Sequence, residues 1–180
     1  MEEIVTDRLV IRSFNPNDWK DLYEYLSDEE VVKFEPYDTF SENQAIEEAM
    51  RRSQDESFYA VCLKEKLKDN QKIIGNLYLA KGEFDTWELG YVFNSKYQGI
   101  GYATESAKAL VEYAFTNLGA RRILAHCSPQ NDSSWKLLER LQMRREGLFL
   151  ENVYFKRDDN EMPIWLDSYQ YAILKTEWHS

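Results

Sequence analysis

The sequence has few of the residues that metal sites and disulfides need, because its 180 residues include only two cysteines and two histidines. Cys62 and Cys127 each lie inside an apolar run of strand type, where a free cysteine is most often a small buried hydrophobe. His126 and His179 do not stand at ligand spacing from each other or from a cysteine. We therefore expect two buried, unpaired cysteines and no metal site.

Two further absences concern membranes and nucleic acids. No run approaches the roughly 18 apolar residues of a membrane helix, and the acidic start Met1-Glu2-Glu3 lacks the basic and then apolar order of a secretory signal. The formal charge of -10 leaves no basic stripe to neutralise the phosphates of a duplex. These absences predict a cytoplasmic protein without a membrane or nucleic-acid partner. The acidic balance suits a cationic substrate, although it also serves solubility alone.

The first third of the chain reads as one strand followed by three helices. Val5–Arg12 alternates like a strand, Pro16 opens a helix, and Ser27–Phe34 looks like a short helix. Ser41–Gln44 has the form of a capping box for a third helix. The residues expected on the buried faces of the first and third helices are Trp19, Leu22, Tyr23, Leu26, Ala45, Ile46, Ala49 and Met50.

The rest of the chain predicts a sheet. Three strand candidates, Phe58–Leu63, Ile73–Leu79 and Trp87–Phe93, are separated by the polar stretches Lys64–Asn70 and Lys81–Thr86, which indicates an antiparallel meander. An amphipathic helix then runs to Leu118 and stops at Gly119. The remaining candidates are a strand at Arg122–Cys127, a short helix from Asn131 that packs Leu137, Leu138 and Leu141, and strands at about Gly147–Phe155 and Trp165–Leu174. With no repeat or linker, residues 1–180 read as a single mixed α+β domain with one parallel crossover.

A glycine turn at Tyr97–Ala103 carries the strongest functional signal. It joins a strand to a helix N-terminus, where the first backbone N–H groups lack intrahelical partners and the helix dipole is positive, so the turn favours phosphate oxygens. Gly99 and Gly101 let the backbone approach a diphosphate, and the small Ala103 keeps the first helical turn close to it. The residues assigned to this contact are Gln98, Gly99, Ile100, Gly101, Tyr102 and Ala103.

Two common phosphate-binding motifs do not fit this turn. A dinucleotide-binding fold needs a glycine or alanine where Thr104 stands, together with repeated parallel units. A triphosphate-binding loop needs Gly-Lys-Ser or Gly-Lys-Thr at the end of the turn, and this triplet does not occur in the sequence. A plain structural turn would explain one glycine but not the paired spacing.

The Gln-x-x-Gly-x-Ala form of the turn resembles the GNAT family of acyl-CoA-dependent N-acetyltransferases. Four other segments are similar to its RimJ/RimL-like branch, the ribosomal-protein N-terminal acetyltransferases: Thr6–Arg12, Trp87–Tyr91, Asn131–Arg140 and the closing residues Asp167–Tyr169 with Glu177-Trp178. The resemblance runs nearly end to end. It implies a GNAT fold, in which helices flank a mixed, mostly antiparallel sheet, and acetyl-CoA as co-substrate without a metal.

The resemblance also implies how the coenzyme is held. The strand that ends at Tyr91, Val92 and Phe93 would offer backbone N–H groups to the pantetheine arm and to the thioester carbonyl. Asn131 would hold the pantetheine amide. Such donors would stabilise the oxyanion formed when an amine attacks the thioester directly.

Three residues are candidates for proton transfer. Glu88, flanked by Trp87 and Leu89, is the candidate base, acting directly or through a water, and partial desolvation is expected to raise its pKa. His126 is a second base candidate. Ser134 is the candidate proton donor to the leaving thiolate, since Leu138 stands where many family members have a tyrosine. Each also has a structural reading: a solvated or arginine-paired carboxylate, a satisfied strand histidine and a helix-start serine.

Two departures from the family pattern are visible. The chain has Gln142-Met143 where Gly-Phe is usual, which puts the end of the short helix in doubt, and Gln98 where arginine is commoner, which removes a positive charge near the diphosphate. The segment with Phe34, Glu35 and Tyr37 corresponds to the inter-helix loop from which the family builds part of its acceptor pocket.

The function implied is transfer of an acetyl group to a primary amine in a ternary complex, with a peptide N-terminal amine as the first choice of acceptor. A small-molecule amine such as a polyamine, amino sugar or antibiotic is the alternative. A non-catalytic coenzyme-binding module and a pure interaction domain are the readings from other classes. The family often forms dimers, and the aromatic tail around Trp165, Tyr169 and Tyr171 is the candidate interface.

Overall fold

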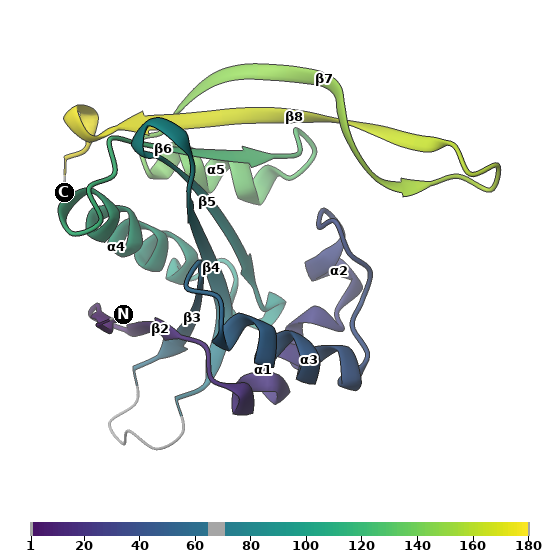
Figure 1. Ribbon diagram of the computed structural model, residues 1–180, viewed down its shortest axis with the longest axis horizontal. Coiled ribbons are helices and arrows are strands. Elements are labelled where there is room, and N and C mark those ends of the chain that lie inside the picture. The colour runs from purple at the N-terminus through teal and green to yellow at the C-terminus, as the bar shows by residue number, and fades with distance from the viewer. Residues whose placement is uncertain (1, 65–70, 180) are drawn as a thin grey trace.

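One eight-stranded sheet runs through the protein in this computed structural model, which describes residues 2–64 and 71–179 (Figure 1). The strand order is β1-β2-β3-β4-β5-β6-β8-β7, and all neighbours are antiparallel except β5 and β6. The strands are β1 (Ile4–Val5), β2 (Leu9–Ser13), β3 (Phe58–Leu63), β4 (Ile73–Lys81), β5 (Thr86–Phe93), β6 (Arg122–Cys127), β7 (Arg144–Arg157) and β8 (Pro163–Leu174). The expected α+β sheet with one parallel crossover is confirmed.

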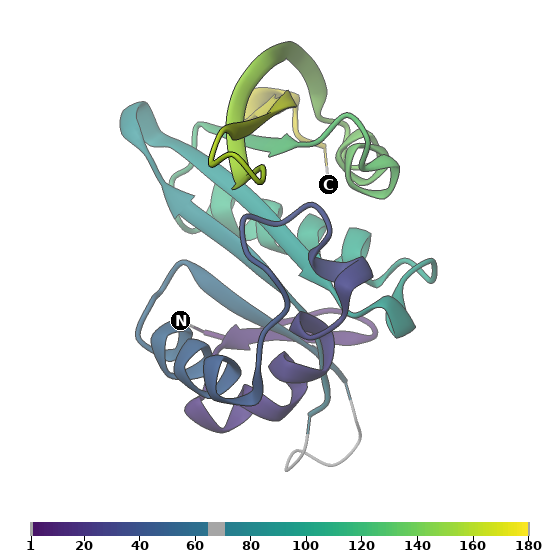
Figure 2. The same cartoon turned by 90° about the vertical axis from the view of Figure 1, so that its right-hand side faces the viewer.

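Helices cover both faces of the sheet (Figures 1 and 2). On one face lie α1 (Trp19–Leu26), α2 (Glu29–Val32) and α3 (Glu42–Ser53), and on the other lie α4 (Tyr102–Thr116) and α5 (Asp132–Arg140). Short 3-10 turns are η1 (Pro16–Asp18), η2 (Glu83–Asp85), η3 (Ser95–Tyr97) and η4 (Lys175–Glu177). None of the helices in the described ranges has the length and apolar character needed to cross a membrane.

Two hydrophobic cores follow from this arrangement, one on each face. The core under α4 and α5 contains Leu110 and Val111, and the core under α1 and α3 contains Leu22 and Cys62, all with no exposed surface. Both cysteines are free and buried, as predicted. Strand β5 contributes to both cores, because Val92 points to the α1 and α3 side while Phe93 points to the α4 side.

Several element boundaries match the prediction, and the mismatches have local causes. Strands β3 and β6 have the expected bounds, and Ser41 and Gln44 form the expected capping box. The first predicted strand is instead split into β1 and β2, because Thr6 closes a turn by donating its backbone N–H to the Leu9 carbonyl at 3.0 Å. The predicted polar link at residues 64–70 lies, apart from Lys64, outside the described residues.

The predicted faces of α1 and α3 are partly wrong. Tyr23 is 36% exposed whereas Tyr25 is fully buried, and the buried Tyr25 hydroxyl donates to Asn76 Oδ1 at 2.9 Å. On α3 the expected Ile46 and Met50 are exposed, and Arg52 is buried instead. Of the remaining predicted residues on these faces, Leu22, Leu26, Ala45 and Ala49 are buried, and Trp19 is partly buried.

Helix α5 ends in a Schellman motif with a glutamine at the position that favours glycine. Met143 donates its N–H to the Leu138 carbonyl at 3.1 Å, Gln142 donates to the Glu139 carbonyl at 2.9 Å, and Gln142 has φ +60°. The departure from Gly-Phe therefore leaves the helix end intact. The substitution of glutamine for glycine leaves backbone strain at Gln142, because its φ is positive.

We expect Gln142→Gly to stabilise the protein by about 0.5–1 kcal/mol, because glycine adopts the left-handed conformation without the penalty of a Cβ atom. Urea unfolding at constant m-value measures this change. Gln54→Gly is the matched control, since Gln54 ends α3 with φ -102° and gains nothing from glycine. A lower midpoint for Gln142→Gly than for the parent protein would contradict the expectation.

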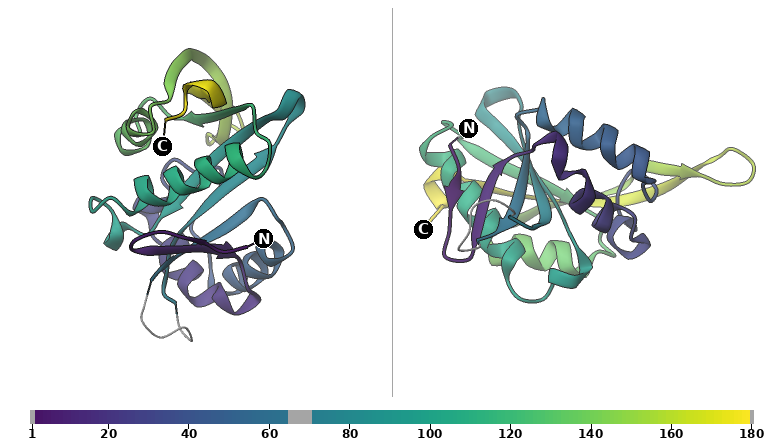
Figure 3. Two further views of the ribbon diagram at one scale, coloured as in Figure 1. Left: turned by 90° about the vertical axis from the view of Figure 1, so that its left-hand side faces the viewer. Right: turned by 90° about the horizontal axis from the view of Figure 1, so that it is seen from below.

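Strands β7 and β8 form a long hairpin that extends beyond the rest of the molecule (Figures 1 and 3). The predicted turn around Asp158-Asp159-Asn160 joins the two strands. Large apolar side chains are exposed along the hairpin: Leu148, Phe149, Leu150, Tyr154, Phe155, Met162, Ile164, Trp165 and Leu166. An ion pair of 2.6 Å between Lys156 Nζ and Asp38 Oδ1 connects it to the segment between α2 and α3.

Candidate active site

The parallel strands β5 and β6 separate after three residue pairs. They are paired at Thr86 with Arg122, Trp87 with Ile123 and Glu88 with Leu124, and within the described residues they form no pair beyond these. Strand β5 continues from Leu89 to Phe93 with β4 as its partner. The β5 backbone is therefore free to bind a ligand along its β6 side, over the segment that contains the predicted Tyr91, Val92 and Phe93.

The glycine turn follows β5 after the short 3-10 turn η3 and has the backbone that its sequence predicts. Gly99 and Gly101 have φ +77° and +89°, and Gly101 is the N-cap of α4, so no side chain caps the first turn of this helix. Gln98 donates its Nε2–H to the Phe93 carbonyl at 3.0 Å, which ties the turn to the end of β5. Ile100 is 53% exposed. The N-terminal N–H groups of α4 are thus available to an anion.

Two arginines that the sequence did not single out lie at this turn. Arg8 donates from Nη1 to the Ile100 carbonyl at 3.0 Å and from Nε to Glu105 at 2.6 Å, and its guanidinium carbon lies 4.6 Å from the centre of the Tyr102 ring. Arg140 of α5 donates to the Thr104 hydroxyl at 3.2 Å. Both guanidinium groups lie beside the turn, where Gln98 replaces the commoner arginine, and Glu105 balances the charge of Arg8.

On the α5 side of the opening, Tyr91 meets Ser134. The Tyr91 hydroxyl lies 2.9 Å from Ser134 Oγ and donates to the Ser134 carbonyl at 3.0 Å. Burial raises the pKa of Tyr91, so its hydroxyl stays protonated. Asn131 is the N-cap of α5, because its side-chain oxygen accepts from the Ser134 N–H at 3.2 Å. The helix-start role considered for Ser134 thus belongs to Asn131, and the Ser134 hydroxyl is left to Tyr91.

Glu88 and His126 form a pair on the opposite face of the sheet. Glu88 Oε1 lies 3.0 Å from His126 Nδ1, and His126 Nε2 lies 3.1 Å from the Gln170 side-chain oxygen. The hydrogen bond to His126 lowers the pKa of Glu88, and the same bond raises the pKa of His126. The expectation that desolvation raises the pKa of Glu88 is wrong, because the β5–β6 register places a histidine beside it.

We expect Glu88→Gln to lower the pKa of His126, since the bond to Glu88 is the main cause of its raised value. An NMR titration of the His126 ring signals measures the midpoint in both proteins. Glu83→Gln, at an exposed site in η2, is the control for loss of one carboxylate. An unchanged midpoint in Glu88→Gln would show that the pair does not form in solution.

A cavity of about 590 Å³ lies on the α1 and α3 side of β5. Its walls come from the segment between α2 and α3, from α3 and from strands β4 and β5. They include Glu35, Tyr37, Phe40, Arg52, Asn76, Tyr78, Gly90, Tyr91 and Val92. The sequence pointed to Glu35 and Tyr37, whereas Phe34 does not line the cavity, and the α3 and β4 residues gave no sequence signal because their partners are distant in the chain.

Burial gives Glu35 a titration range near neutrality. It raises the pKa of the Glu35 carboxyl to about 7, against the opposing effects of the Tyr37 hydroxyl and the charge of Arg52. Arg52 is 2% exposed and donates from Nε to Glu48 at 2.7 Å. The cavity therefore contains a carboxyl group whose protonation changes in the working range of most enzymes.

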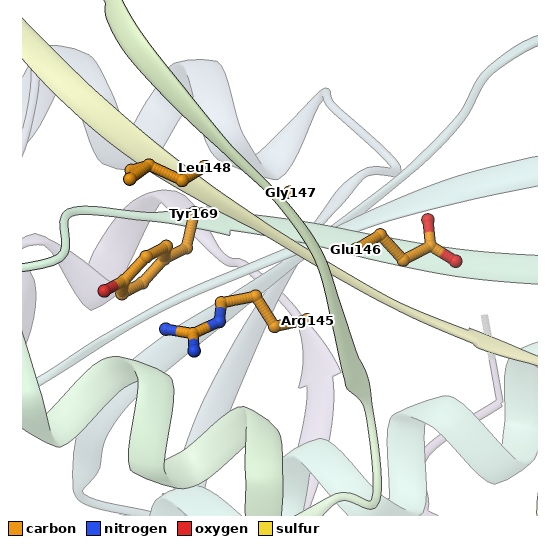
Figure 4. A pocket seen from close by; sticks show the side chains of 5 residues that line it. All are labelled: Arg145, Glu146, Gly147, Leu148 and Tyr169. Atoms are coloured by element: carbon orange, nitrogen blue, oxygen red, sulfur yellow. The ribbon is translucent and has the colours of Figure 1, made fainter.

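A smaller cavity of about 330 Å³ lies at the base of β7 and β8 (Figure 4). The Arg145 guanidinium carbon is 4.4 Å from the centre of the Tyr169 ring, and both side chains point to the same side of the hairpin while Glu146 points away. None of the residues predicted for the site lines this cavity. Over residues 2–64 and 71–179, no group of three His, Cys, Asp or Glu side chains is arranged to hold a metal ion.

Comparison with known proteins finds one family and several full-length relatives. Residues 8–144 match the model of the Acetyltransferase (GNAT) domain. The chain is similar to the uncharacterized N-acetyltransferase YnaD of Bacillus subtilis, with 39% identity over 180 residues that cover 98% of this chain and 99% of that protein. The crystal structure of a GNAT-family acetyltransferase from Bacillus anthracis is 34% identical, with a TM-score of 0.84 over 98% of this chain and 100% of that one.

A more distant relative has a defined acceptor. The [ribosomal protein uS5]-alanine N-acetyltransferase of Escherichia coli is 29% identical over 113 residues, which cover 61% of this chain and 55% of that protein.

Proposed function

The chain belongs to the GNAT acetyltransferase family, and from this premise we propose that it transfers an acetyl group from acetyl-CoA to a primary amine by direct attack in a ternary complex. The observation that carries the proposal is the opening between β5 and β6 immediately before the glycine turn. A thioester in the opening would meet free β5 backbone, and its diphosphate would reach the turn and the α4 N-terminus.

The proposed reaction needs an oxyanion site and no covalent enzyme intermediate. Backbone N–H groups of β5 would stabilise the oxyanion, and each such donor contributes on the order of 3 kcal/mol in other enzymes. Burial raises the pKa of Cys62 to about 12 and that of Cys127 to about 11, so neither thiol is a ready nucleophile. This agrees with the direct attack.

We assign the proton donor for the leaving thiolate to Ser134, with the Tyr91 hydroxyl 2.9 Å behind it. Together these two hydroxyls would take the place of the tyrosine that many family members have at the position of Leu138. Glu88 and His126 remain the base candidates from the sequence, although a carboxylate with a lowered pKa is a weaker base than we expected.

For the acceptor we propose a peptide N-terminal amine, which places the chain near the RimJ/RimL-like branch. The similarity to the uS5-alanine N-acetyltransferase supports this choice. A small-molecule amine is the alternative, because a cavity of about 590 Å³ is within the size range of small-molecule sites. A non-catalytic coenzyme-binding module is the third reading.

Release of free thiol from acetyl-CoA tests the proposal. The panel contains a peptide with an N-terminal alanine, the same peptide with a blocked N-terminus, spermidine and an aminoglycoside. We expect thiol release with the free peptide and none with the blocked one. If a polyamine or amino sugar reacts more than 10-fold faster than the peptide, the small-molecule amine becomes the proposed acceptor. If the protein binds the coenzyme but releases thiol with none of the amines, it is not an acetyltransferase for this panel and the proposed activity is wrong.

We also propose that the hairpin of β7 and β8 pairs with a second copy of the chain. Trp165 is 51% exposed and fits the predicted interface, whereas Tyr171 is 1% exposed and does not. Light scattering of the parent protein and of Trp165→Glu tests this, because a charge in an apolar contact is expected to shift a dimer to monomer. If the parent protein stays monomeric over a 100-fold range of concentration, the proposed dimer is wrong.

A further inference from the structure

Three carboxyl groups line the cavity, those of Glu35, Glu48 and Asp55, and the proposed reaction does not yet use any of them. Glu48 and Asp55 form ion pairs with arginines of α3, which leaves Glu35 as the candidate. Glu35 lies on the segment between α2 and α3, and its backbone N–H donates to the Val32 carbonyl at 2.9 Å. Phe40 closes the same segment by donating its N–H to the Leu26 carbonyl at 2.9 Å, and its ring meets that of Tyr37 edge to face at 5.3 Å. Glu35 is therefore held in place on an ordered loop.

The same cavity reaches the strand on which the thioester is proposed to lie. Gly90, Tyr91 and Val92 of β5 line it together with Glu35. These three residues lie beyond Glu88, where β5 has no ladder pair with β6 in the described residues. An amine in the cavity would thus have the Glu35 carboxylate on one side and the free β5 backbone on the other.

We propose that Glu35 is the general base that takes the proton from the acceptor ammonium, an inference that rests on the proposed acetyl transfer. The carboxylate accepts one proton from nitrogen, and the lone pair set free forms the C–N bond at the thioester carbonyl carbon. The C–S bond then breaks with its electron pair on sulfur. Nitrogen loses a second proton and sulfur gains one, so the only proton released to solvent is the one that Glu35 held.

The surroundings of Glu35 suit a base that works near neutrality. The titratable and charged groups that face this part of the cavity are Tyr37 on its own segment, Tyr25 on α1, Glu48 and Arg52 on α3, Tyr78 on β4 and Tyr91 on β5. Burial favours the neutral carboxyl, while the Tyr37 hydroxyl and Arg52 favour the carboxylate. Arg51 and Asp55 also line the cavity and pair with each other at 3.2 Å.

Glu88, the other carboxylate considered as the base, differs from Glu35 in its pKa and in its position relative to the cavity. Its side chain is 50% exposed and bonded to His126, which holds its pKa below the usual value. It does not line the cavity. A base that is ionised at all working pH values and already paired has little affinity for the proton of an ammonium.

The test is the pH profile of kcat/KM for the parent protein, Glu35→Gln, Tyr37→Phe and Glu88→Gln, with the best acceptor of the thiol-release panel. The parent protein is expected to lose activity tenfold per pH unit below about pH 7, because the protonated carboxyl accepts no proton. Glu35→Gln is expected to lose about 100-fold at pH 7 and to recover above pH 9 as the amine loses its own proton. In Tyr37→Phe the acid limb moves to higher pH, since the hydroxyl that favours the carboxylate is gone.

Three results would overturn the inference. These are an unchanged profile in Glu35→Gln, an equal loss at every pH with the acid limb retained, or a larger loss at pH 7 in Glu88→Gln than in Glu35→Gln. Coenzyme affinity, measured by calorimetry, is expected to be equal in Glu35→Gln and the parent protein, which reports the folded site. If the parent protein acetylates no amine, the proposed function fails; if it does and Glu35→Gln behaves like it, only this inference fails.

Discussion

Replacing Gly101 with alanine is expected to weaken acetyl-CoA binding by about 10- to 100-fold without unfolding the protein. Gly101 has φ +89°, and a Cβ atom there would stand 3.3 Å from Arg8 Nη2. The turn would have to relax away from the left-handed conformation, and the proposed phosphate contact would lose at least one charge-assisted hydrogen bond, worth about 1.5–3 kcal/mol. Calorimetric titration with coenzyme A measures the loss.

The control for this variant is Gly119→Ala. Gly119 also has a positive φ, +73°, and a Cβ atom there would meet nothing within 4 Å. It lies beyond the end of α4, so it carries a similar backbone penalty at the other end of the helix. Equal coenzyme affinities for the two variants would mean that the turn does not bind the diphosphate.

Replacing Gly75 with alanine is expected to lower the free energy of unfolding by about 3 kcal/mol. A Cβ atom at Gly75 would lie 2.6 Å from the Val92 carbonyl oxygen and 2.6 Å from Phe93 Cδ1. The first contact is with backbone, so β4 and β5 must move apart, and overpacking of this kind costs about 1–3 kcal/mol or more. For a chain of this size the melting temperature should fall by about 6–12 °C.

Gly90→Ala is the matched control on the partner strand. The nearest atom to a Cβ there is Tyr78 Cβ at 3.4 Å, which is an ordinary contact. We expect its melting temperature to stay within about 2 °C of the parent protein. If Gly75→Ala and Gly90→Ala have the same melting temperature, the close approach of β4 and β5 is absent in solution.

Local sequence signals predicted most elements and the turn, because each depends on neighbours along the chain. The alternation in Phe58–Leu63 and Arg122–Cys127 defined two strands, and the paired glycines defined the left-handed positions at the turn. The buried arginine was missed for a physical reason. Arg52 is accommodated by Glu48 and by the rings of Phe14 and Phe58, and no helical periodicity anticipates such a partner set.

The site was predicted less completely, since its contacts join distant segments. Arg8 meets Glu105 across 97 positions, and His126 meets Glu88 across 38, so neither pair leaves a spacing pattern. The second pair reversed the expected direction of the Glu88 pKa shift. The functions proposed for Glu88, Ser134 and Asn131 stay predictions, whereas the Tyr91 and Ser134 contact is a finding that only the fold provides.

Strand β5 separates two compartments by the thickness of one strand. The proposed acceptor cavity lies on the α1 and α3 side, while the glycine turn and Ser134 belong to the α4 and α5 side, and Tyr91 takes part in both. Neither ligand then has to pass the other on its way in or out. We therefore expect random order: either substrate can bind the free enzyme first, and either product can leave first.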